Sequence, residues 1–401
     1  MKAHARAAVL ILTGLIFLIN TSVVAEDVHI QAAGPIGLGY IGMYYGLVNP
    51  ADGNWYEAQV DDFMGGFDTS TTWLAVVDTG ASASILGKST QIAYDAGTPI
   101  PLQLYPDVKF TDIGFGGTVD FAVTEPVQVM IAGQKAATGD TENHALFNAY
   151  TPAITMAAAR DFIGGGEIDM DIIGTSILQG QVLQVDPHEL EFLRWMLFTM
   201  AGSLDNTPPA AGGQVLYVPM TMQGFFTEPP AADVGENPML PIKIRRTAGD
   251  AFAERSALFD TGSPVNFVSE SFALDAGIDT SAPADLTIPV IGVGGEETTR
   301  DGYYVDALSL ELGAGREGDQ LVFANTAVFV IPDANMPGGL EAILGNGILS
   351  PSTELVDTTV TEWYVDMRDG DNPYLIVVVP EPASASLLLF GALAILIRRR
   401  K

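Results

Sequence analysis

Two segments of this chain carry the same pattern of residues, and this repeat limits the possible folds more than any other feature. VVDTGAS at 76–82 and LFDTGSP at 258–264 each place Asp-Thr-Gly directly after an apolar run. Each copy continues to a Gly-Gly pair, and then to two apolar residues followed by Gly-x-x-Ile-Leu. The glycines of these later elements are Gly116, Gly117 and Gly174 in the first copy and Gly294, Gly295 and Gly345 in the second. Matched elements in one order predict a duplicated structural unit.

The two aspartates of the repeat, Asp78 and Asp260, suit acid–base chemistry as a pair. A single Asp-Thr-Gly is usually a turn that closes a strand, because Asp and Gly both suit turn conformations. Two carboxyl groups held close together cannot both ionise. One then keeps a proton and can donate it to a carbonyl oxygen, while the other can take a proton from water. A repeat that brings the two aspartates together across a pseudo-two-fold axis therefore predicts an acid–base site that needs no metal.

The residues around each Asp suit such a site. The apolar run before each Asp predicts a buried strand, where two carboxyl groups interact strongly. Gly80 and Gly262 allow a tight turn and a close approach of another segment. Gly174 and Gly345 have no side chain to clash, so the apolar-Gly segment of each copy can pass beside the turn.

These motifs resemble those of the pepsin-like and retropepsin-like aspartic proteases, and the resemblance covers about residues 60–375. It implies a mainly β, bilobal acid protease fold with a pseudo-two-fold repeat. It implies that Asp78 and Asp260 are the catalytic pair, and that Thr79 and Thr261 hydrogen-bond across the lobe boundary. It also implies a peptide or protein substrate and no cofactor.

The Gly-Gly pairs are expected at the tips of flaps. Pepsin-like enzymes carry a Tyr in the flap of the first lobe, but TDIGFGGTVDF at 111–121 contains none. GFGG and GVGG are more similar to the Gly-rich flaps of retropepsins. We therefore expect a fused, duplicated retropepsin-like enzyme with Gly116, Gly117, Gly294 and Gly295 in its flaps. Ordinary hairpin turns are the alternative.

The residue after Asp-Thr-Gly differs between the copies. It is Ala81 in the first and Ser263 in the second. In the family this position can offer a hydroxyl to the nearby carboxylate, and such a hydrogen bond favours the charged form. The resemblance thus predicts that Ser263 favours charge on Asp260 and leaves the shared proton mainly on Asp78.

Composition and spacing predict the division of the chain. The abundance of Gly (43) and Pro (24) favours short strands joined by turns. The best candidate for a short helix is HELEFLRWMLF at 188–198. The expected segments are a signal peptide at 1–25, a first lobe at 27–190, a linker at 191–213, a second lobe at 214–376 and a tail at 377–401.

Both ends of the chain are expected to direct its location. The N-terminus has a basic start, an apolar stretch and small residues before Ala25, which is typical of a signal peptide; a single-span anchor is the alternative. The C-terminus resembles the PEP-CTERM sorting signal of bacteria, with Pro380-Glu381-Pro382, an apolar run at 385–397 and Arg398–Arg400. That resemblance implies export, a membrane anchor before processing, and an exosortase-type processing enzyme. A plain C-terminal anchor is the alternative.

Charge and motif content exclude several classes of function. The chain has 18 Lys and Arg against 49 Asp and Glu, a net charge of −31, and such a surface repels nucleic acid. It has no Cys and hence no disulfide. The sequence His188-Glu189 begins like a zinc motif, but Phe192 stands where the second His is required.

No metal is predicted, although two pairs of acidic residues have the chemistry to bind Ca²⁺. These are Asp169 with Asp171, and Asp369 with Asp371. The second pair is more typical of an Asp-Gly hairpin between two apolar runs. The function predicted from these residues is an exported aspartic endopeptidase. The alternative is a non-catalytic surface or matrix protein that uses a protease-like fold for binding.

Overall fold

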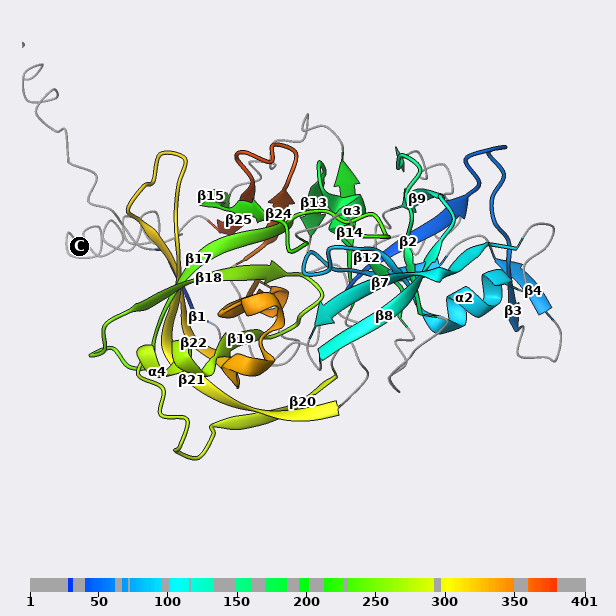
Figure 1. Ribbon diagram of the computed structural model, residues 1–401. Helices are drawn as coiled ribbons and strands as arrows, with labels where there is room; N and C mark the ends of the chain where they lie inside the picture. The colour runs from blue at the N-terminus through cyan, green and yellow to red at the C-terminus, as the bar shows by residue number, and fades with distance from the viewer. Residues whose placement is uncertain are drawn as a thin grey trace, which may run out of the picture.

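The structure is a computed structural model that describes most of the chain between residues 28 and 380. The described residues are 28–31, 40–61, 67–70, 73–95, 101–114, 117–132, 149–159, 170–185, 195–201, 213–226, 230–291, 297–349 and 360–380. Within them the protein is mainly β and bilobal, as expected. Figure 1 shows most strands of the first half on the right and most strands of the second half on the left.

One large sheet is built mainly from the first half of the chain. In the described residues it has 14 strands, in the order β15-β25-β24-β13-β14-β2-β5-β12-β6-β11-β8-β7, with β9 beside β2 and β10 beside β9. Its strands are β2 (Tyr40–Val48), β5 (Trp73–Val77), β6 (Ile85–Leu86), β7 (Leu104–Gly114), β8 (Gly117–Thr124), β9 (Gln128–Ala132), β10 (Ala149–Tyr150), β11 (Ala157–Ala158), β12 (Ile172–Ile173), β13 (Val182–Val185), β14 (Trp195–Ala201), β15 (Gly213–Pro219), β24 (Glu362–Asp366) and β25 (Tyr374–Pro380). The helices α2 (Lys88–Asp95) and α3 (Thr175–Leu178) and the hairpin of β3 (Ala58–Asp61) and β4 (Phe67–Ser70) complete this half.

The second sheet is built mainly from the second half. In the described residues it has nine strands, in the order β1-β22-β19-β23-β18-β17-β21-β20, with β16 beside β17. Its strands are β1 (Val28–Gln31), β16 (Thr221–Gln223), β17 (Asn237–Arg245), β18 (Ala253–Asp260), β19 (Asn266–Ser269), β20 (Leu286–Ile291), β21 (Glu297–Glu311), β22 (Gln320–Ile331) and β23 (Ala342–Gly345). The helical elements are α4 (Glu270–Asp275), η4 (Asp333–Asn335), η5 (Pro337–Gly339) and η6 (Asn346–Leu349).

The two Asp-Thr-Gly turns lie in equivalent strand environments. β5 leads into Asp78 and pairs in parallel with β12, which also pairs antiparallel with β6. β18 ends at Asp260 and pairs in parallel with β23, which also pairs antiparallel with β19. The apolar residues that end each entering strand, such as Val77 and Phe259, are fully buried. The repeat seen in the sequence therefore corresponds to a repeat in strand pairing.

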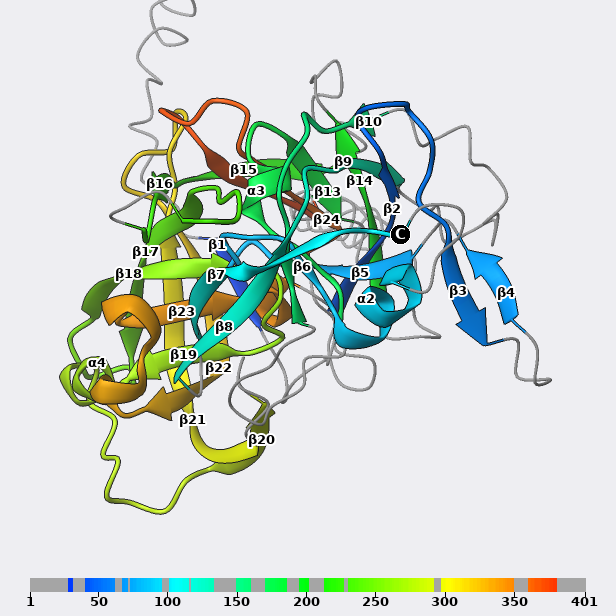
Figure 2. The ribbon, with the colours of Figure 1, turned by 45° about the vertical axis from the view of Figure 1, so that its right-hand side comes forward.

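The sheets do not follow the lobe limits expected at 190 and 214. β15, β24 and β25, from the second half, join β13 in the sheet of the first half. Conversely, β1 from the start of the chain pairs in parallel with β22 of the second half. Figure 2 shows β13, β14, β15 and β24 gathered in one region beside both halves. Sequence spacing could not reveal this exchange, because the choice of a partner strand is a long-range property.

The helix expected at 188–198 is wrong for its later part. Trp195–Ala201 forms β14, and the earlier residues lie outside the described ones. β14 pairs antiparallel with β13 and in parallel with β2. Aromatic and β-branched residues such as Trp195 and Thr199 favour a strand when neighbouring strands offer hydrogen bonds on both sides. This strand also lies within the range expected as a linker.

The tail expected to begin at 377 overlaps the fold. β25 runs to Pro380, and its residues Val377 and Val378 are buried. The signal peptide at 1–25 and residues 381–401 lie outside the described residues. Among the residues that the structure describes, no helix has the length and apolarity needed to span a bilayer.

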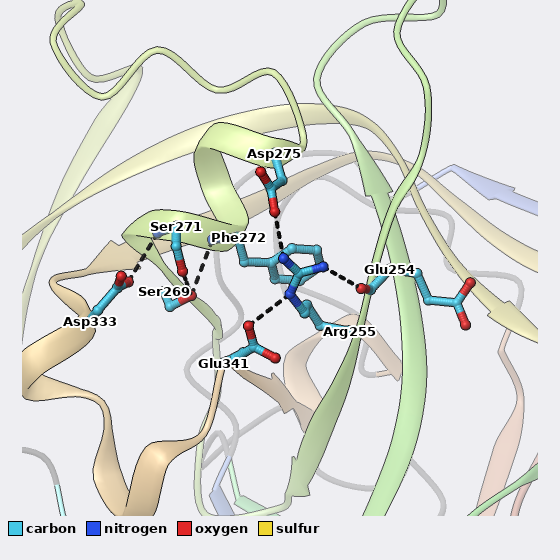
Figure 3. Close-up of polar contacts among 8 residues, drawn as sticks. All are labelled: Glu254, Arg255, Ser269, Ser271, Phe272, Asp275, Asp333 and Glu341. Atoms are coloured by element: carbon cyan, nitrogen blue, oxygen red, sulfur yellow. Dashed lines mark hydrogen bonds and ion pairs between the residues drawn. The ribbon is translucent and has the colours of Figure 1, made fainter.

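Ion pairs of Arg255 hold α4 against β18, the strand that leads to Asp260. Arg255 on β18 bonds to Asp275 on α4, and its Nε lies 2.8 Å from Oε1 of Glu341, the residue before β23. The guanidinium also lies over the ring of Phe272, 5.4 Å from its centroid. Ser269 caps α4 by accepting a hydrogen bond from the Phe272 amide at 3.2 Å. Figure 3 shows these contacts converging on one side of β18.

We predict that the fold requires the chain up to Pro380. A protein that ends at Pro380 should unfold at the temperature of the longer chain. A protein that ends at Leu375 loses most of the pairing of β25 with both of its neighbours, from residue 376 on. It also loses the four buried side chains of 376–379, which at about 1.5 kcal/mol each amount to about 6 kcal/mol. Thermal unfolding followed by circular dichroism tests this, and equal midpoints for both truncated proteins would contradict it.

Candidate active site

The structure brings the two aspartates of the repeat together. A Cβ atom placed on Gly80 would lie 2.6 Å from Cγ of Asp260, and one placed on Gly262 would lie 2.4 Å from Cγ of Asp78. Each turn therefore closes directly against the carboxyl group of the opposite half, and only Gly fits. The two carboxyl groups hydrogen-bond to each other and are partly exposed to solvent.

Four hydrogen bonds between Thr79 and Thr261 and their neighbours join the two turns. The Thr79 amide donates to Oγ1 of Thr261 at 3.0 Å, and the Thr261 amide donates to Oγ1 of Thr79 at 3.1 Å. The Thr79 hydroxyl donates to the Phe259 carbonyl at 2.6 Å, and the Thr261 hydroxyl donates to the Val77 carbonyl at 2.7 Å. Both Thr residues are fully buried. Each hydroxyl thus both accepts from and donates to the opposite half.

The two apolar-Gly segments pass behind the turns. A Cβ atom on Gly174 would lie 2.2 Å from the Ala83 carbonyl oxygen, and one on Gly345 would lie 2.3 Å from that of Val265. The residue after each Gly then donates its amide to the residue after Asp-Thr-Gly. These bonds are Thr175 to Ala81 at 2.8 Å and Asn346 to Ser263 at 2.9 Å. The glycines at 174 and 345 therefore permit the close contact that supports each turn.

The surroundings of the two carboxyl groups assign the proton to Asp260. Desolvation raises the pKa of both, and it is the largest cause for each. Oδ1 of Asp78 accepts from the amides of Gly80 at 2.8 Å and Ala81 at 3.0 Å, and these bonds favour its charged form. The charge of Asp78 and its hydrogen bond raise the pKa of Asp260 further, well above the ordinary range. These directions favour Asp78 as the carboxylate and Asp260 as the acid.

The expected role of the Ser263 hydroxyl is wrong. It donates to the Val265 carbonyl at 2.8 Å, within its own turn, and not to Asp260. Ser263 contributes to Asp260 through its backbone amide instead. Backbone amides act on both carboxyl groups: those of Gly80, Ala81 and Gly262 favour the charged form of Asp78, and those of Gly262 and Ser263 favour the charged form of Asp260. The pKa of Asp260 is raised further than that of Asp78, which favours the proton on Asp260, the reverse of the expected arrangement.

A hairpin lies in each half where the sequence predicted a flap, and Gly117 is the one expected flap glycine among the described residues. β7 pairs antiparallel with β8 up to Gly114 and Gly117, and Gly117 adopts a φ of 115°. β20 pairs in the same way with β21, up to Ile291 and Glu297. Gly116, Gly294 and Gly295 themselves lie outside the described residues. Hairpins are thus present in both halves at the positions where flaps were expected.

Tyr40 is a neighbour of the site that the sequence did not reveal. It begins β2, two residues before Gly42, which pairs with Val76 next to the first turn. Desolvation raises the pKa of its phenol, and the carboxyl group of Asp260 raises it further. The phenol therefore lies within electrostatic reach of the dyad. No motif surrounds Tyr40, so only the pairing of β2 with β5 could have indicated its place.

The acidic pairs considered for Ca²⁺ have other roles where they are described. Asp171 is buried and accepts from the Gly87 amide at 2.7 Å and the Thr90 hydroxyl at 2.8 Å. Asp369 accepts from the Asp371 amide at 3.0 Å in the turn between β24 and β25. Asp169 lies outside the described residues. Within the described ranges, no group of three or more His, Cys, Asp or Glu residues is arranged to hold a metal ion.

Comparison with known proteins finds similarity at the level of structure alone. No protein-family model and no curated protein sequence matches the chain. The aspartic proteinase of Irpex lacteus is similar with a TM-score of 0.45 and 13% identity, over 86% of this chain and 98% of that one. A retropepsin-like aspartic protease from Rickettsia conorii is similar with a TM-score of 0.20 and 15% identity, over 35% of this chain and 92% of that one. Similarity at this level assigns no activity to the chain.

We predict that Asp260→Asn stabilises the protein at neutral pH. The raised pKa means that native Asp260 holds its proton at pH values where the unfolded chain has lost it. Stability therefore falls as pH rises from the ordinary Asp range through the native pKa. Asn carries no such penalty, so the variant should be more stable than the wild type at pH 7 and equal to it near pH 3.

Urea unfolding at the two pH values tests this prediction. Asp301→Asn, at an exposed position on β21, is the matched control and should leave stability unchanged at both. An Asp260→Asn variant that is less stable than the wild type at pH 7 would contradict the assigned protonation.

Proposed function

We propose that this protein is an aspartic endopeptidase that hydrolyses peptide bonds with a water molecule activated by Asp78 and Asp260. The observation that carries the proposal is a pair of hydrogen-bonded carboxyl groups, one from each half, whose surroundings differ. The amides of Gly80, Ala81 and Gly262 favour the charged form of Asp78, while the pKa of Asp260 is raised well above its ordinary range, which favours its protonated form. Pairs of titratable groups whose environments separate their pKa values are the usual basis of acid–base catalysis.

The proposed reaction has two proton-transfer steps. In the first, the Asp78 carboxylate takes a proton from water as the water oxygen bonds to the carbonyl carbon, and Asp260 donates its proton to the carbonyl oxygen. The product is a tetrahedral diol. In the second, Asp78 returns its proton to the amide nitrogen and Asp260 recovers one from a hydroxyl, so the C–N bond breaks to give an acid and an amine. Each carboxyl group ends in its starting state.

The rigid support of the turns favours catalysis over a purely structural role for the dyad. Acid–base groups must be held close to their working geometry by packing and hydrogen bonds. Here the buried pair Thr79 and Thr261 fixes the turns relative to each other, and Gly80 and Gly262 let each carboxyl group approach the opposite turn. A protein that used this fold only for binding has no need of two ionisable groups held at its centre.

We also propose that the enzyme works outside the cytoplasm after export and processing at its C-terminus. The support is the sequence of its two ends, with the signal-peptide pattern before Ala25 and the PEP-CTERM-like tail after Pro380. Mass spectrometry of the protein from its native host should find a chain that lacks residues 1–25 and Arg398–Lys401. An exported chain that keeps its basic C-terminus would contradict processing.

We predict that Asp78→Asn and Asp260→Asn each lower kcat/KM by about 10³-fold or more, because removing an acid–base group typically costs 10²–10⁴-fold and the pair acts as a unit. Digestion of a peptide library by the wild type at several pH values gives a substrate for the measurement. Asp301→Asn is the control and should retain activity. Folded Asn variants with turnover close to that of the wild type would overturn the proposal.

A further inference from the structure

The two halves support their Asp-Thr-Gly turns in different ways. In the second half, Nδ2 of Asn346 donates to the Thr261 carbonyl at 2.6 Å. The residue equivalent to Asn346 in the first half is Thr175, because each follows the Gly of the apolar-Gly segment and donates its amide to the equivalent turn residue. Thr175 has no side-chain amide, and its hydroxyl lies 3.3 Å from the Ala81 carbonyl oxygen. The repeat therefore lacks one donor in its first copy.

Asn237 supplies the missing donor from the opposite half. Its Nδ2 donates to the Thr79 carbonyl at 2.8 Å, and its Oδ1 accepts from the Ser82 hydroxyl at 2.6 Å. The side chain is fully buried. Asn237 begins β17, in the sheet of the second half, so this bond crosses between the halves. The side-chain amide of Asn237 thus donates to the Thr79 carbonyl, as the side-chain amide of Asn346 donates to the Thr261 carbonyl.

The segment before Asn237 is held against the first half. The Gly235 amide donates to the Ser82 carbonyl at 2.9 Å, and Val234 forms a bridge with Ala83. A Cβ atom on Gly235 would lie 2.3 Å from the Thr175 carbonyl oxygen, so this position needs Gly. The backbone of the second half therefore occupies the space beside Thr175, and this docking places Asn237 at the turn.

The hydrogen bond from Asn237 acts on the peptide group whose amide favours the charged form of Asp78. The carbonyl of Thr79 and the amide of Gly80 belong to the same planar peptide unit. That amide donates to Oδ1 of Asp78 at 2.8 Å. A donor at one end of a peptide group fixes its orientation and strengthens the donation at the other end, because hydrogen bonds in a chain polarise one another. Asn237 is thereby linked to the dyad through one rigid unit.

We propose that Asn237 is a positioning residue for the dyad, which holds the Thr79–Gly80 peptide so that its amide keeps Asp78 ionised. This inference rests on the proposed peptidase function. It adds that Asn237, a residue of the second half outside the repeated motifs, supplies a hydrogen-bond donor to the first turn. The pseudo-symmetric counterpart on the Asp260 side is Asn346.

The test compares kcat/KM against pH for the wild type and for Asn237→Ala. Loss of the donor weakens the amide bond to Asp78 and raises the pKa of its carboxyl group. Less carboxylate then remains at a given acidic pH. The acidic limb of the profile should move toward neutral pH, with kcat/KM lowered about tenfold at the acidic end and the change mainly in kcat. Because the pair titrates as a unit, the limb reports the pair as a whole.

Asp233→Ala is the matched control in the same docking segment. Asp233 accepts from the Thr155 amide at 2.7 Å, so its loss weakens docking without touching the Thr79 peptide. The acidic limb should stay in place for this variant. An unmoved limb in Asn237→Ala, or an equal shift in Asp233→Ala, would overturn the inference. If Asn237→Ala does not fold, Asn237→Leu, which is close in shape, takes its place.

A second measurement does not depend on activity. Hydrogen exchange at the Gly80 amide should be faster in Asn237→Ala than in the wild type, and unchanged in Asp233→Ala. If the wild type hydrolyses no peptide, the proposed function fails, but this exchange still decides the role of Asn237. Unchanged exchange at Gly80 in Asn237→Ala contradicts that role whether or not the protein is a peptidase.

Discussion

The crossed hydrogen bonds of Thr79 and Thr261 are the constraint on which the rest of the site depends. Each hydroxyl accepts from the amide of the other Thr and donates to the strand that enters the opposite turn. All of these groups are buried, so a hydroxyl that lost its partner would leave polar groups unpaired at a cost of about 1–3 kcal/mol each. The two halves therefore cannot separate without penalty, and Asp78 and Asp260 stay in contact.

The asymmetry of the dyad arises from a nearly symmetric frame. Both carboxyl groups are desolvated, and both accept a bond from the Gly two residues later. The difference lies in smaller features. The amide of Gly262 acts on Asp78 in addition to those of Gly80 and Ala81, while Asp260 has the amides of Gly262 and Ser263 and no bond from the Ser263 hydroxyl. A small difference in donors suffices to choose which carboxyl group ionises, because the two interact so strongly that only one can.

The sequence predicted the centre of the fold better than its surroundings. The apolar run, Asp-Thr-Gly and the later Gly segments specify local strand and turn geometry, so the meeting of Asp78 and Asp260 followed from the repeat. The shared sheet, β14 and the extent of β25 depend on which strands pair over long distances. Tyr40 and Asn237 reach the site only through that pairing. The direction of the Ser263 hydroxyl depends on a competing acceptor, the Val265 carbonyl, that no motif marks.

The central claim is that Asp78 and Asp260 form one coupled pair with the proton on Asp260. Carbon-13 NMR of labelled Asp carboxyl groups measures this directly, with the Asp260 signal assigned by its loss in Asp260→Asn. In the wild type, the pKa of Asp260 should lie well above the ordinary Asp range. It should fall in Asp78→Asn, because the neighbouring charge is gone, while desolvation keeps it partly raised. An Asp260 that titrates in the ordinary range, or that is unaffected by Asp78→Asn, would contradict the account.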